Sequence, residues 1–403
     1  MKNKKKWIKY RHKIVRNILF FVIYPFARIK YGIKIEKLKE QKQRQYLILY
    51  NHQTAFDQFF VGMTFKETVY YLASEDLFSN GIVSSIIRFL VAPIPIKKQS
   101  GDVGAVMNCI RVAREGGTIA IAPEGNRTYS GKTEYINPAI SALARKLKLP
   151  IAFVKIEGGY GVHPRWSDVL RNGKMRVYVS KIVEPEEYSN LDNDTLTDLI
   201  RQELYINEAE LEGEFFHKKS AEYLERAIYV CPDCGLSTFE SHNDEIRCTL
   251  CNKVIRYLPN KRLEGKSSEF PFNSVNEWYD YQCKFVSNLN LEDYHIKPMY
   301  RENANVSEVI VYKHKISLQK WADLALFGNR IVIDGDGIDR LEMSFDDIDA
   351  ISVLGKNKLN IYYNKKVYQI KGDKRFNALK FVNIYYSYRN LEKEKTNGKF
   401  LGL

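Results

Sequence analysis

The sequence lacks an N-terminal apolar run long enough to cross a bilayer. The apolar stretch 18–27 contains ten residues, whereas a membrane-spanning helix needs about 20. The run breaks up at Pro25, Phe26 and Arg28, without the small-residue cleavage site of a secretory signal. We therefore expect neither a transmembrane helix nor a signal peptide in this region.

Cysteine is also scarce, with six residues in a chain of 403. Four of them follow a metal-type spacing, and the other two, Cys109 and Cys283, stand alone. This distribution argues against a disulfide framework. It indicates a reducing compartment, which we take to be the cytoplasmic side of a membrane. The sequence shows no internal repeat, and its one low-complexity tract is the lysine-rich start.

Acidic residues are almost absent from the first 44 positions. Residues 1–44 contain 15 Lys and Arg but only two acidic residues, Glu36 and Glu40. The whole chain carries a formal charge of +14 from 62 basic and 48 acidic residues, which leaves 47 basic against 46 acidic residues after position 44. A local basic arm of this kind indicates nucleic acid or an anionic membrane surface as its partner.

The aromatic content of the same arm favours a membrane. Trp7, Tyr10, Tyr24 and Tyr31 suit the membrane–water interface, and each Lys or Arg attracts anionic headgroups by about 1 kcal/mol. We predict that residues 1–44 form an in-plane or re-entrant anchor. The protein is then peripheral or monotopic on the cytoplasmic face of the cell membrane. The alternative is a soluble first helix that packs on its own domain.

Residues 45–225 alternate short apolar runs with helical patterns. The apolar runs are 46–50, 68–73, 92–96, 118–125, 150–159 and 175–185. Strands that are apolar throughout and alternate with helices are typical of an α/β fold, in which helices flank a sheet. Functional groups in such folds gather on the loops that leave the strand ends, where His52 and Glu124 stand.

The sequence changes character after position 225. Residues 226–258 contain the four spaced cysteines, and 259–300 is interpreted as a helical linker. From 301 to 403, six or seven short strands with turn signals precede a closing helix. This order resembles a small β-rich, PH-like or GRAM-like barrel with a C-terminal helix. A generic small α+β domain is the alternative.

The spaced cysteines, Cys231, Cys234, Cys248 and Cys251, form the pattern Cys-x2-Cys-x13-Cys-x2-Cys. Two such pairs provide four thiolates for a tetrahedral Zn²⁺ with no open coordination position, so we predict a structural zinc ribbon. The metal would supply folding energy that so small a module lacks. A nucleic-acid role is the sharper alternative, but the ribbon has no basic cluster, and nucleic acid is not an expected partner.

The stretch YNHQTAFD, residues 50–57, contains His52 five positions before Asp57. In the simpler interpretation, Thr54 caps a helix that starts at Ala55, and the aspartate is favoured by the helix dipole. In the functional interpretation, the histidine removes a proton from a hydroxyl group, and the carboxylate fixes its tautomer. The activated hydroxyl could then attack an acyl carbonyl without an acyl-enzyme intermediate.

The stretch IAIAPEGNRTYSG, residues 119–131, provides a second candidate. A buried strand ends at Pro123, and Glu124, Gly125 and Arg127 follow. Glycine lets a backbone approach a ligand closely, and arginine offers a two-pronged donor for phosphate. Glu124 could hold Arg127 or accept a substrate hydroxyl. The alternative is a strand-end turn with a surface ion pair.

Together, NHQTAFD and the later APEGNRT resemble the signature boxes of the PlsC-type lysophospholipid acyltransferases, the 1-acylglycerol-3-phosphate acyltransferase family. That family shows a His-x4-Asp box and then a Phe-Pro-Glu-Gly-Thr-Arg-Ser box at this separation. Two weaker blocks also correspond. APIPIKK has Lys98 where an arginine usually stands, and LPIAFVKIEG has Pro150 but Phe153 in place of a second proline. The resemblance covers roughly residues 15–225.

The resemblance implies a role for each matched residue. His52 would be the general base on the acceptor hydroxyl, Asp57 would orient it, and Asn51 would support the loop. The residues implied to bind the glycerophosphate-like end of the acceptor are Glu124, Gly125, Arg127 and, as a helper, Lys98. The donor would be a thioester, acyl-CoA or acyl-ACP (acyl carrier protein), and the acceptor a lysophospholipid such as 1-acyl-glycerol-3-phosphate.

The sequence departs from the family pattern at several positions. Ala122, Asn126 and Thr128 replace Phe, Thr and Ser of the second box. Lysine at 98 loses the bidentate geometry of arginine, since its ammonium acts as a point charge. These changes leave the acyl-transfer chemistry intact. They mean that the acceptor could instead be another glycerolipid or a glycolipid.

Two other function classes are compatible with parts of the sequence. In the first, the chain is a non-catalytic, membrane-tethered adaptor whose acyltransferase-like domain binds lipid, while the ribbon and C-terminal domain bind a protein or lipid partner. The intact motif residues argue against it. In the second, the chain binds nucleic acid through its basic arm and ribbon, which does not explain the apolar and aromatic residues of that arm.

Overall fold

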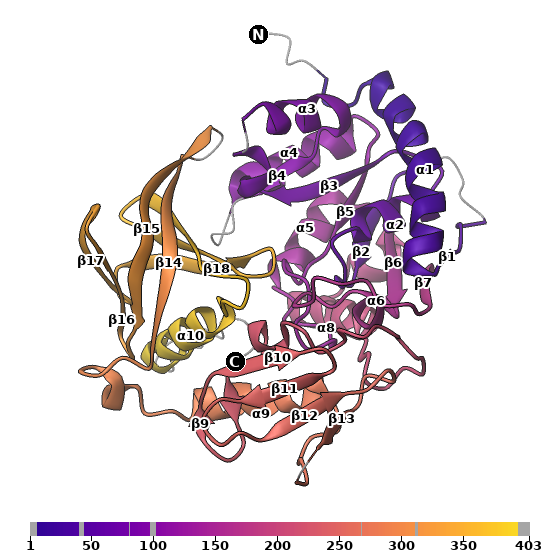
Figure 1. The fold of residues 1–403 in the computed structure, drawn as a ribbon. Coiled ribbons are helices and arrows are strands. Elements are labelled where there is room, and N and C mark those ends of the chain that lie inside the picture. The colour runs from indigo at the N-terminus through magenta and orange to yellow at the C-terminus, as the bar shows by residue number, and fades with distance from the viewer. Residues whose placement is uncertain are drawn as a thin grey trace. The chain divides into compact units, whose positions relative to one another are not determined.

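The computed structural model describes residues 6–39, 44–79, 81–96, 102–266, 268–310 and 313–393. The chain divides into two compact units. The first consists of Met1–Pro164 and Leu170–Phe215, and the second of Arg165–Val169 and Phe216–Leu403. Figure 1 labels the helices and strands of both units.

The first unit is a sheet flanked by helices. Its helices are α1 (Tyr10–Tyr31), α2 (Asp57–Thr64), α3 (Ile82–Val91), α4 (Val103–Arg114), α5 (Ala139–Leu147), α6 (Gly159–Val162), α7 (Pro185–Tyr188) and α8 (Asn193–Leu204), with a short 3₁₀ helix at Glu75–Phe78. Its strands are β1 (Ile33–Ile35), β2 (Leu47–Tyr50), β3 (Val69–Ser74), β4 (Ile94–Ile96), β5 (Thr118–Ile121), β6 (Ile151–Glu157) and β7 (Met175–Val183).

The sheet is mixed but mostly parallel, in the order β1-β7-β6-β2-β5-β3-β4. β2 lies between β5 and β6 and is parallel to both. β7 runs antiparallel to β6, and β1 pairs with β7 in parallel. The predicted α/β class, a sheet flanked by helices, is therefore confirmed for this unit.

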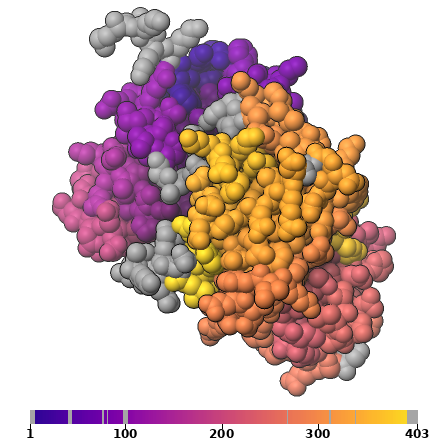
Figure 2. Space-filling model, turned by 90° about the vertical axis from the view of Figure 1, so that its left-hand side faces the viewer, coloured from indigo at the N-terminus to yellow at the C-terminus, as the bar shows by residue number. Residues whose placement is uncertain are grey.

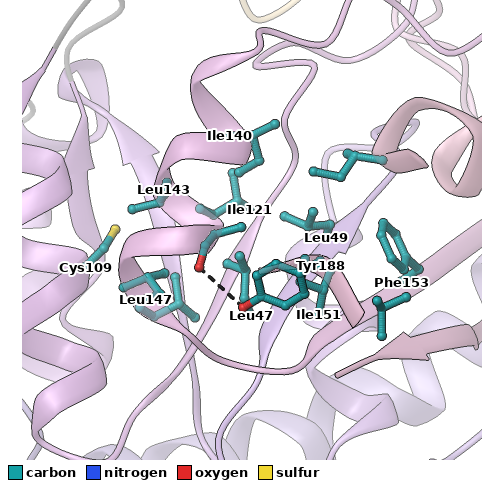
Figure 3. Close-up of a cluster of buried hydrophobic side chains, with 14 of the residues drawn as sticks. Leu47, Leu49, Cys109, Ile121, Ile140, Leu143, Leu147, Ile151, Phe153 and Tyr188 are labelled. Atoms are coloured by element: carbon teal, nitrogen blue, oxygen red, sulfur yellow. Dashed lines mark hydrogen bonds between the residues drawn. The ribbon is translucent and has the colours of Figure 1, made fainter. Parts of the chain in front are cut away.

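Each face of the sheet has its own apolar core, because alternate residues of a strand point to opposite faces. Leu47 and Leu49 of β2 pack with residues of α4, α5 and α8, and Figure 3 shows this cluster. Ile48 and Tyr50 pack on the other side with residues of α1 and α2. Burial on both faces explains why the strands are apolar throughout.

The end of α1 is joined directly to the edge of the sheet. Gly32 has a positive φ of 55° and ends the helix, and a Cβ at this position would lie 2.1 Å from the carbonyl oxygen of Gly173. The chain then forms β1, a strand that the sequence patterns did not predict. No helix in the described residues combines the length and apolar content needed to cross a membrane.

The second unit is built from small antiparallel sheets. β8 (Val230–Cys231) pairs with β9 (Gly235–Leu236), and β10 (Phe239–His242), β11 (Glu245–Cys248), β12 (Val254–Tyr257) and β13 (Leu263–Gly265) form a four-stranded sheet. The helices are α9 (Val275–Ser287), α10 (Leu379–Lys393) and the 3₁₀ segments Leu224–Arg226 and Leu291–Tyr294. The remaining strands are β14 (Tyr300–Ile310), β15 (His314–Leu326), β16 (Arg330–Gly335), β17 (Ile338–Ser344), β18 (Ile348–Leu354), β19 (Lys358–Tyr363) and β20 (Lys366–Lys371).

The last seven strands form one curled antiparallel sheet in the order β17-β16-β15-β14-β20-β19-β18, which is orange to yellow in Figure 2. The Tyr385 hydroxyl of α10 donates to the carbonyl oxygen of Ile348 at 2.7 Å, which fixes the closing helix to β18. The predicted run of strands with a C-terminal helix is present. Its two longest strands, β14 and β15, end and begin within the stretch 308–315.

Candidate active site

The two sequence motifs leave the sheet at the same edge. β2 and β5 are parallel neighbours, with Leu49 opposite Ile121, so their carboxyl ends point the same way. The loop 51–56 follows β2 and the loop 122–138 follows β5. The residues of both loops therefore meet, as expected for strand-end loops of an α/β fold.

The first loop brings His52 and Asp57 into contact. Nδ1 of His52 lies 2.8 Å from Oδ2 of Asp57. The carboxylate side chain is fully buried, whereas the imidazole is 22 % exposed. No hydrogen-bond partner of Nε2 occurs in the described parts of the chain. One ring nitrogen is thus held by a carboxylate, and the other is available to a substrate.

Asp57 is fixed by its own loop. Its carboxylate accepts the backbone N–H of Gln53 at 2.6 Å, the backbone N–H of Thr54 at 2.9 Å and the Thr54 hydroxyl at 2.6 Å. The Thr54 hydroxyl also accepts the backbone N–H of Phe56 at 3.2 Å, but α2 begins at Asp57 rather than at Ala55. The dipole of α2 also favours a negative charge at this position.

The second loop holds the main chain of His52 on both sides. The N–H of His52 donates to Oε1 of Glu124 at 2.8 Å, and its carbonyl oxygen accepts the N–H of Thr128 at 3.0 Å. The other carboxylate oxygen of Glu124 accepts the N–H of Glu134 at 2.8 Å. Glu124 thus connects the backbone of the histidine loop to its own loop.

The pKa of Glu124 is raised to about 8, mainly by burial and partly by the nearby carboxylates of Glu134 and Asp57, while the two backbone N–H donors act in the opposite direction. The side chain is buried. A buried carboxyl that bonds two peptide groups is a structural connector of the site. The sequence motif does not reveal this contact, because it joins residues 72 positions apart.

Two further residues of the first motif fix its loop. The Asn51 amide donates to the carbonyl oxygen of Ile156 at 2.9 Å and accepts the N–H of the same residue at 2.8 Å. Oε1 of Gln53 accepts the N–H of Tyr160 at 3.0 Å. The predicted supporting role of Asn51 agrees with this geometry, whereas Gln53 was missed because nothing in its sequence neighbourhood marks it.

The other predicted residues differ in what surrounds them. Gly125 adopts a positive φ of 68°, and no atom lies within 4 Å of a Cβ built there, so the turn rather than close packing requires glycine. Arg127 is half-buried. Burial raises the pKa of Tyr31, the Asp57 carboxylate adds to this, and the Arg127 guanidinium opposes it. Arg127 and Asp57 therefore both lie within electrostatic range of Tyr31. Lys98 lies outside the described residues.

Residues 32–157 match the family model described as Acyltransferase. The matched segment contains both loops, with His52, Asp57, Glu124 and Arg127. This part of the chain is therefore similar to the acyltransferase family, as the two sequence motifs indicated.

Two curated relatives carry the same kind of description. The chain is 23% identical over 194 residues to 1-acyl-sn-glycerol-3-phosphate acyltransferase LPAT1, chloroplastic, of Arabidopsis thaliana, which covers 46% of this chain and 52% of that protein. It is 21% identical over 178 residues to 1-acyl-sn-glycerol-3-phosphate acyltransferase BAT2, chloroplastic, of Brassica napus, with coverage of 43% and 50%. The chain spans about half the length of these relatives.

A solved structure is also similar to about half of the chain. It is the 1-acyl-sn-glycerophosphate (LPA) acyltransferase PlsC from Thermotoga maritima, with a TM-score of 0.40 and 22% sequence identity. The match covers 49% of this chain and 80% of that one.

The four spaced cysteines form a second candidate site in the other unit. The Sγ atoms of Cys231, Cys234, Cys248 and Cys251 all lie within 4.8 Å of one another, and those of Cys231 and Cys251 are 3.8 Å apart. A tetrahedral site with Zn–S bonds of about 2.3 Å has sulfur atoms about 3.8 Å apart. The positions of the thiols thus fit a single tetrahedral ion.

The turns around the cysteines are of the kind that such a site needs. The residue after each pair, Gly235 or Asn252, has a positive φ, which both residue types tolerate. Lys253 forms a 2.6 Å ion pair with Asp233 and lies within electrostatic range of Cys231. A nearby cation offsets part of the net negative charge that four thiolates would have when they bind a divalent ion.

Proposed function

We propose that the chain transfers an acyl group from a thioester, acyl-CoA or acyl-ACP, to a hydroxyl of a lysophospholipid, with 1-acyl-glycerol-3-phosphate as the acceptor. The observation that carries the proposal is the 2.8 Å contact between His52 and Asp57 inside a segment that matches the acyltransferase family. The most direct test is lipid mass spectrometry of the purified protein with a panel of lysolipids and acyl donors. Absence of any acylated product would refute the proposal.

In the proposed reaction, Nε2 of His52 takes the proton from the acceptor hydroxyl as its oxygen attacks the thioester carbonyl. The buried Asp57 carboxylate keeps Nδ1 protonated and stabilises the imidazolium that forms. The tetrahedral intermediate collapses, the C–S bond breaks, and the imidazolium returns the proton to the departing thiolate. The products are the acylated lipid and the free thiol of the donor.

The proposed role of Arg127 is to bind the acceptor phosphate, together with the turn at Gly125 and with Lys98 as a helper. Replacing Arg127 with alanine should raise the acceptor KM about tenfold or more, because a charge-assisted hydrogen bond contributes about 1.5–3 kcal/mol. The effect should disappear with a monoacylglycerol acceptor, which has no phosphate. The exposed Arg201 provides a matched control variant, and an unchanged KM in Arg127→Ala would remove the phosphate role.

We further propose that Glu124 positions His52, in addition to any contact with the acceptor. In Glu124→Gln one of the two backbone donors, His52 N–H or Glu134 N–H, faces an amide NH2 instead of an acceptor oxygen. An unsatisfied buried donor costs about 1–3 kcal/mol, so kcat should fall about tenfold or more while the acceptor KM changes little. Steady-state kinetics separate the two quantities.

The matched control for this substitution is Glu115→Gln, because the Glu115 carboxylate also accepts two backbone N–H groups, those of Trp7 and Ile8. The control should lower the melting temperature without a selective loss of kcat. A rise in KM at constant kcat in Glu124→Gln would instead favour direct acceptor binding by this residue.

The raised pKa of Glu124 also has a consequence for stability. In the folded protein the Glu124 carboxyl holds its proton up to about pH 8, whereas in the unfolded chain it releases the proton near the ordinary pKa of 4.5. Stability from this group is therefore complete below pH 4.5 and is lost as the pH rises through 8. The melting temperature of Glu124→Gln should fall less over this range than that of the wild type.

We propose that Cys231, Cys234, Cys248 and Cys251 bind a structural Zn²⁺. A four-thiolate site leaves no open position for substrate, so the metal supports folding rather than acyl transfer. The strand order of the last seven strands and the α10 helix favour a PH-like module. In the proposal, the ribbon and this module bind a protein or lipid partner.

The proposed location is the cytoplasmic face of the cell membrane, with residues 1–44 as the anchoring segment. The support is the basic surplus of those residues and the apolar side chains that α1 exposes, among them Ile18 and Phe21. A lipid acceptor is itself located in the membrane, so the enzyme must reach the surface of a leaflet.

A further inference from the structure

Helix α3 has an inverted pattern of burial. Ser84 is its one buried residue, at 1 % exposure, whereas Ile82, Val83, Ile86 and Phe89 are 80, 57, 51 and 58 % exposed. A helix that is apolar around most of its circumference is normally buried in a core. Here four large apolar side chains instead face outward from neighbouring turns. Contiguous exposed apolar surface of this kind marks an interaction site.

Helix α1 exposes a similar stripe. Ile14, Ile18, Phe21, Val22 and Ile29 are exposed, and their spacing of three, four or seven residues puts them on one side of the helix. The opposite side is the one that packs inward, with His12, Ala27 and Tyr31 buried.

The two helices lie side by side, as Figure 1 shows. The Trp7 indole N–H, just before α1, donates to the carbonyl oxygen of Ala92 at 2.9 Å, just after α3. The Arg11 Nε donates to the carbonyl oxygen of Phe89 at 2.8 Å, and its guanidinium lies 3.9 Å from the centre of the Phe89 ring. The outward apolar residues of α1 and α3, named above, therefore belong to one region, which we call the α1–α3 face.

The charged side chains of the two helices themselves are all basic. Neither helix contains an Asp or Glu, and their exposed charged residues are Lys13, Arg28, Lys30 and Arg88. Such a rim is complementary to anionic lipid headgroups. A second copy of the chain in a symmetric dimer would bring the same basic residues together, which is unfavourable.

We propose that α3 is a second lipid-contacting element and that the α1–α3 face docks on an anionic membrane leaflet. The inference rests on the proposed function only in that the acceptor is a membrane lipid. Residues from two distant parts of the sequence then enter the interface region together, and the basic rim meets the headgroups. This mode of contact is in-plane, with apolar side chains inserted into the headgroup boundary.

The docked face leads to the catalytic pair. Tyr31, the last residue of α1, packs edge-on against Phe56 and Phe60 at centroid distances of 5.8 and 5.3 Å. Phe60 belongs to α2, the helix that begins with Asp57. The helix that contacts the leaflet thus ends against the helix that begins with Asp57.

The test is the full-length double variant Ile82→Glu/Ile86→Glu, measured by co-sedimentation with vesicles of phosphatidylcholine and phosphatidylglycerol. Both side chains are exposed, so the fold should be retained. Apolar burial of one such side chain contributes about 1.5–3 kcal/mol, so vesicle affinity should fall at least about tenfold. The variant should also lose transfer to a vesicle-embedded acceptor while it keeps transfer to a short-chain acceptor that is monomeric in solution.

The matched control is Phe216→Glu/Ile296→Glu, which replaces two exposed apolar residues of the other unit and should bind vesicles as the wild type does. Wild-type affinity in the Ile82→Glu/Ile86→Glu variant would overturn the proposal. So would a wild-type dimer that this variant dissociates without any effect on vesicle binding. A wild type that binds vesicles through this face but acylates no acceptor would contradict the proposed function and leave the docking proposal intact.

Discussion

Replacing His52 with alanine should reduce acyl transfer about 10³-fold, because a positioned general base contributes about 10²–10⁴-fold. The loss should appear in kcat, since the imidazole acts on the hydroxyl only as the proton moves. The fold should survive the change. Without the imidazole, Asp57 still accepts two backbone N–H groups and the Thr54 hydroxyl, so no buried charge is left unpaired. Single-turnover transfer with a radiolabelled acyl donor measures the effect.

A control histidine is available outside the site. His242 is exposed on β10, and His242→Ala should transfer acyl groups at the wild-type rate. Thermal unfolding of both variants should match the wild type closely, which separates chemistry from folding. Full activity in His52→Ala would eliminate the proposed mechanism, and equal losses in both variants would point to a nonspecific effect.

Replacing Cys248 with serine should abolish zinc binding and unfold the ribbon. The segment around it contains strands of only two to four residues, which cannot bury enough apolar surface to be stable alone. Structural zinc sites contribute about 10–16 kcal/mol of apparent binding energy in small modules. We expect about one zinc per chain in the wild type by mass spectrometry of the metal and a large loss in the variant.

The matched control is Cys283→Ser, which changes a cysteine outside the cluster and should retain the full metal content. A strong chelator should lower the thermal stability of the wild type and of this control alike, but should add little in Cys248→Ser. A wild type that purifies without metal and is indifferent to the chelator would contradict the zinc site.

The strands of the first unit were predictable because burial on both faces leaves a continuous apolar run, as in 46–50 for β2. β1 was not, because a strand of three residues, Ile33–Ile35, carries almost no local pattern. Its pairing with Met175–Val177 involves residues about 140 positions away. Long-range pairing of a short strand is decided by tertiary packing rather than by propensity.

The residues of the candidate site also divide into those that local sequence predicts and those that it does not. The types and spacing of His52 and Asp57 suggested a pair, and both lie in one loop, so local sequence was enough. The contact of Glu124 with the His52 backbone depends on two loops meeting at the sheet edge, and no pattern of residue types encodes it. The exposure of α3 was likewise hidden, since an apolar decapeptide is normally interpreted as a buried helix.

Residues 7–35 are part of the first unit as well as a candidate anchor. Trp7 and Ile8 pack against one core, and Ala27, Tyr31 and Ile33 belong to the other. Deleting this segment to obtain a soluble enzyme would uncover the edge of β7, since β1 is its parallel neighbour, and remove the aromatic partner of Phe56 and Phe60. An inactive truncated protein would then be explained by damage to the sheet. Its inactivity would not show that the enzyme needs the membrane. Surface substitutions on α3 separate these two effects where truncation cannot.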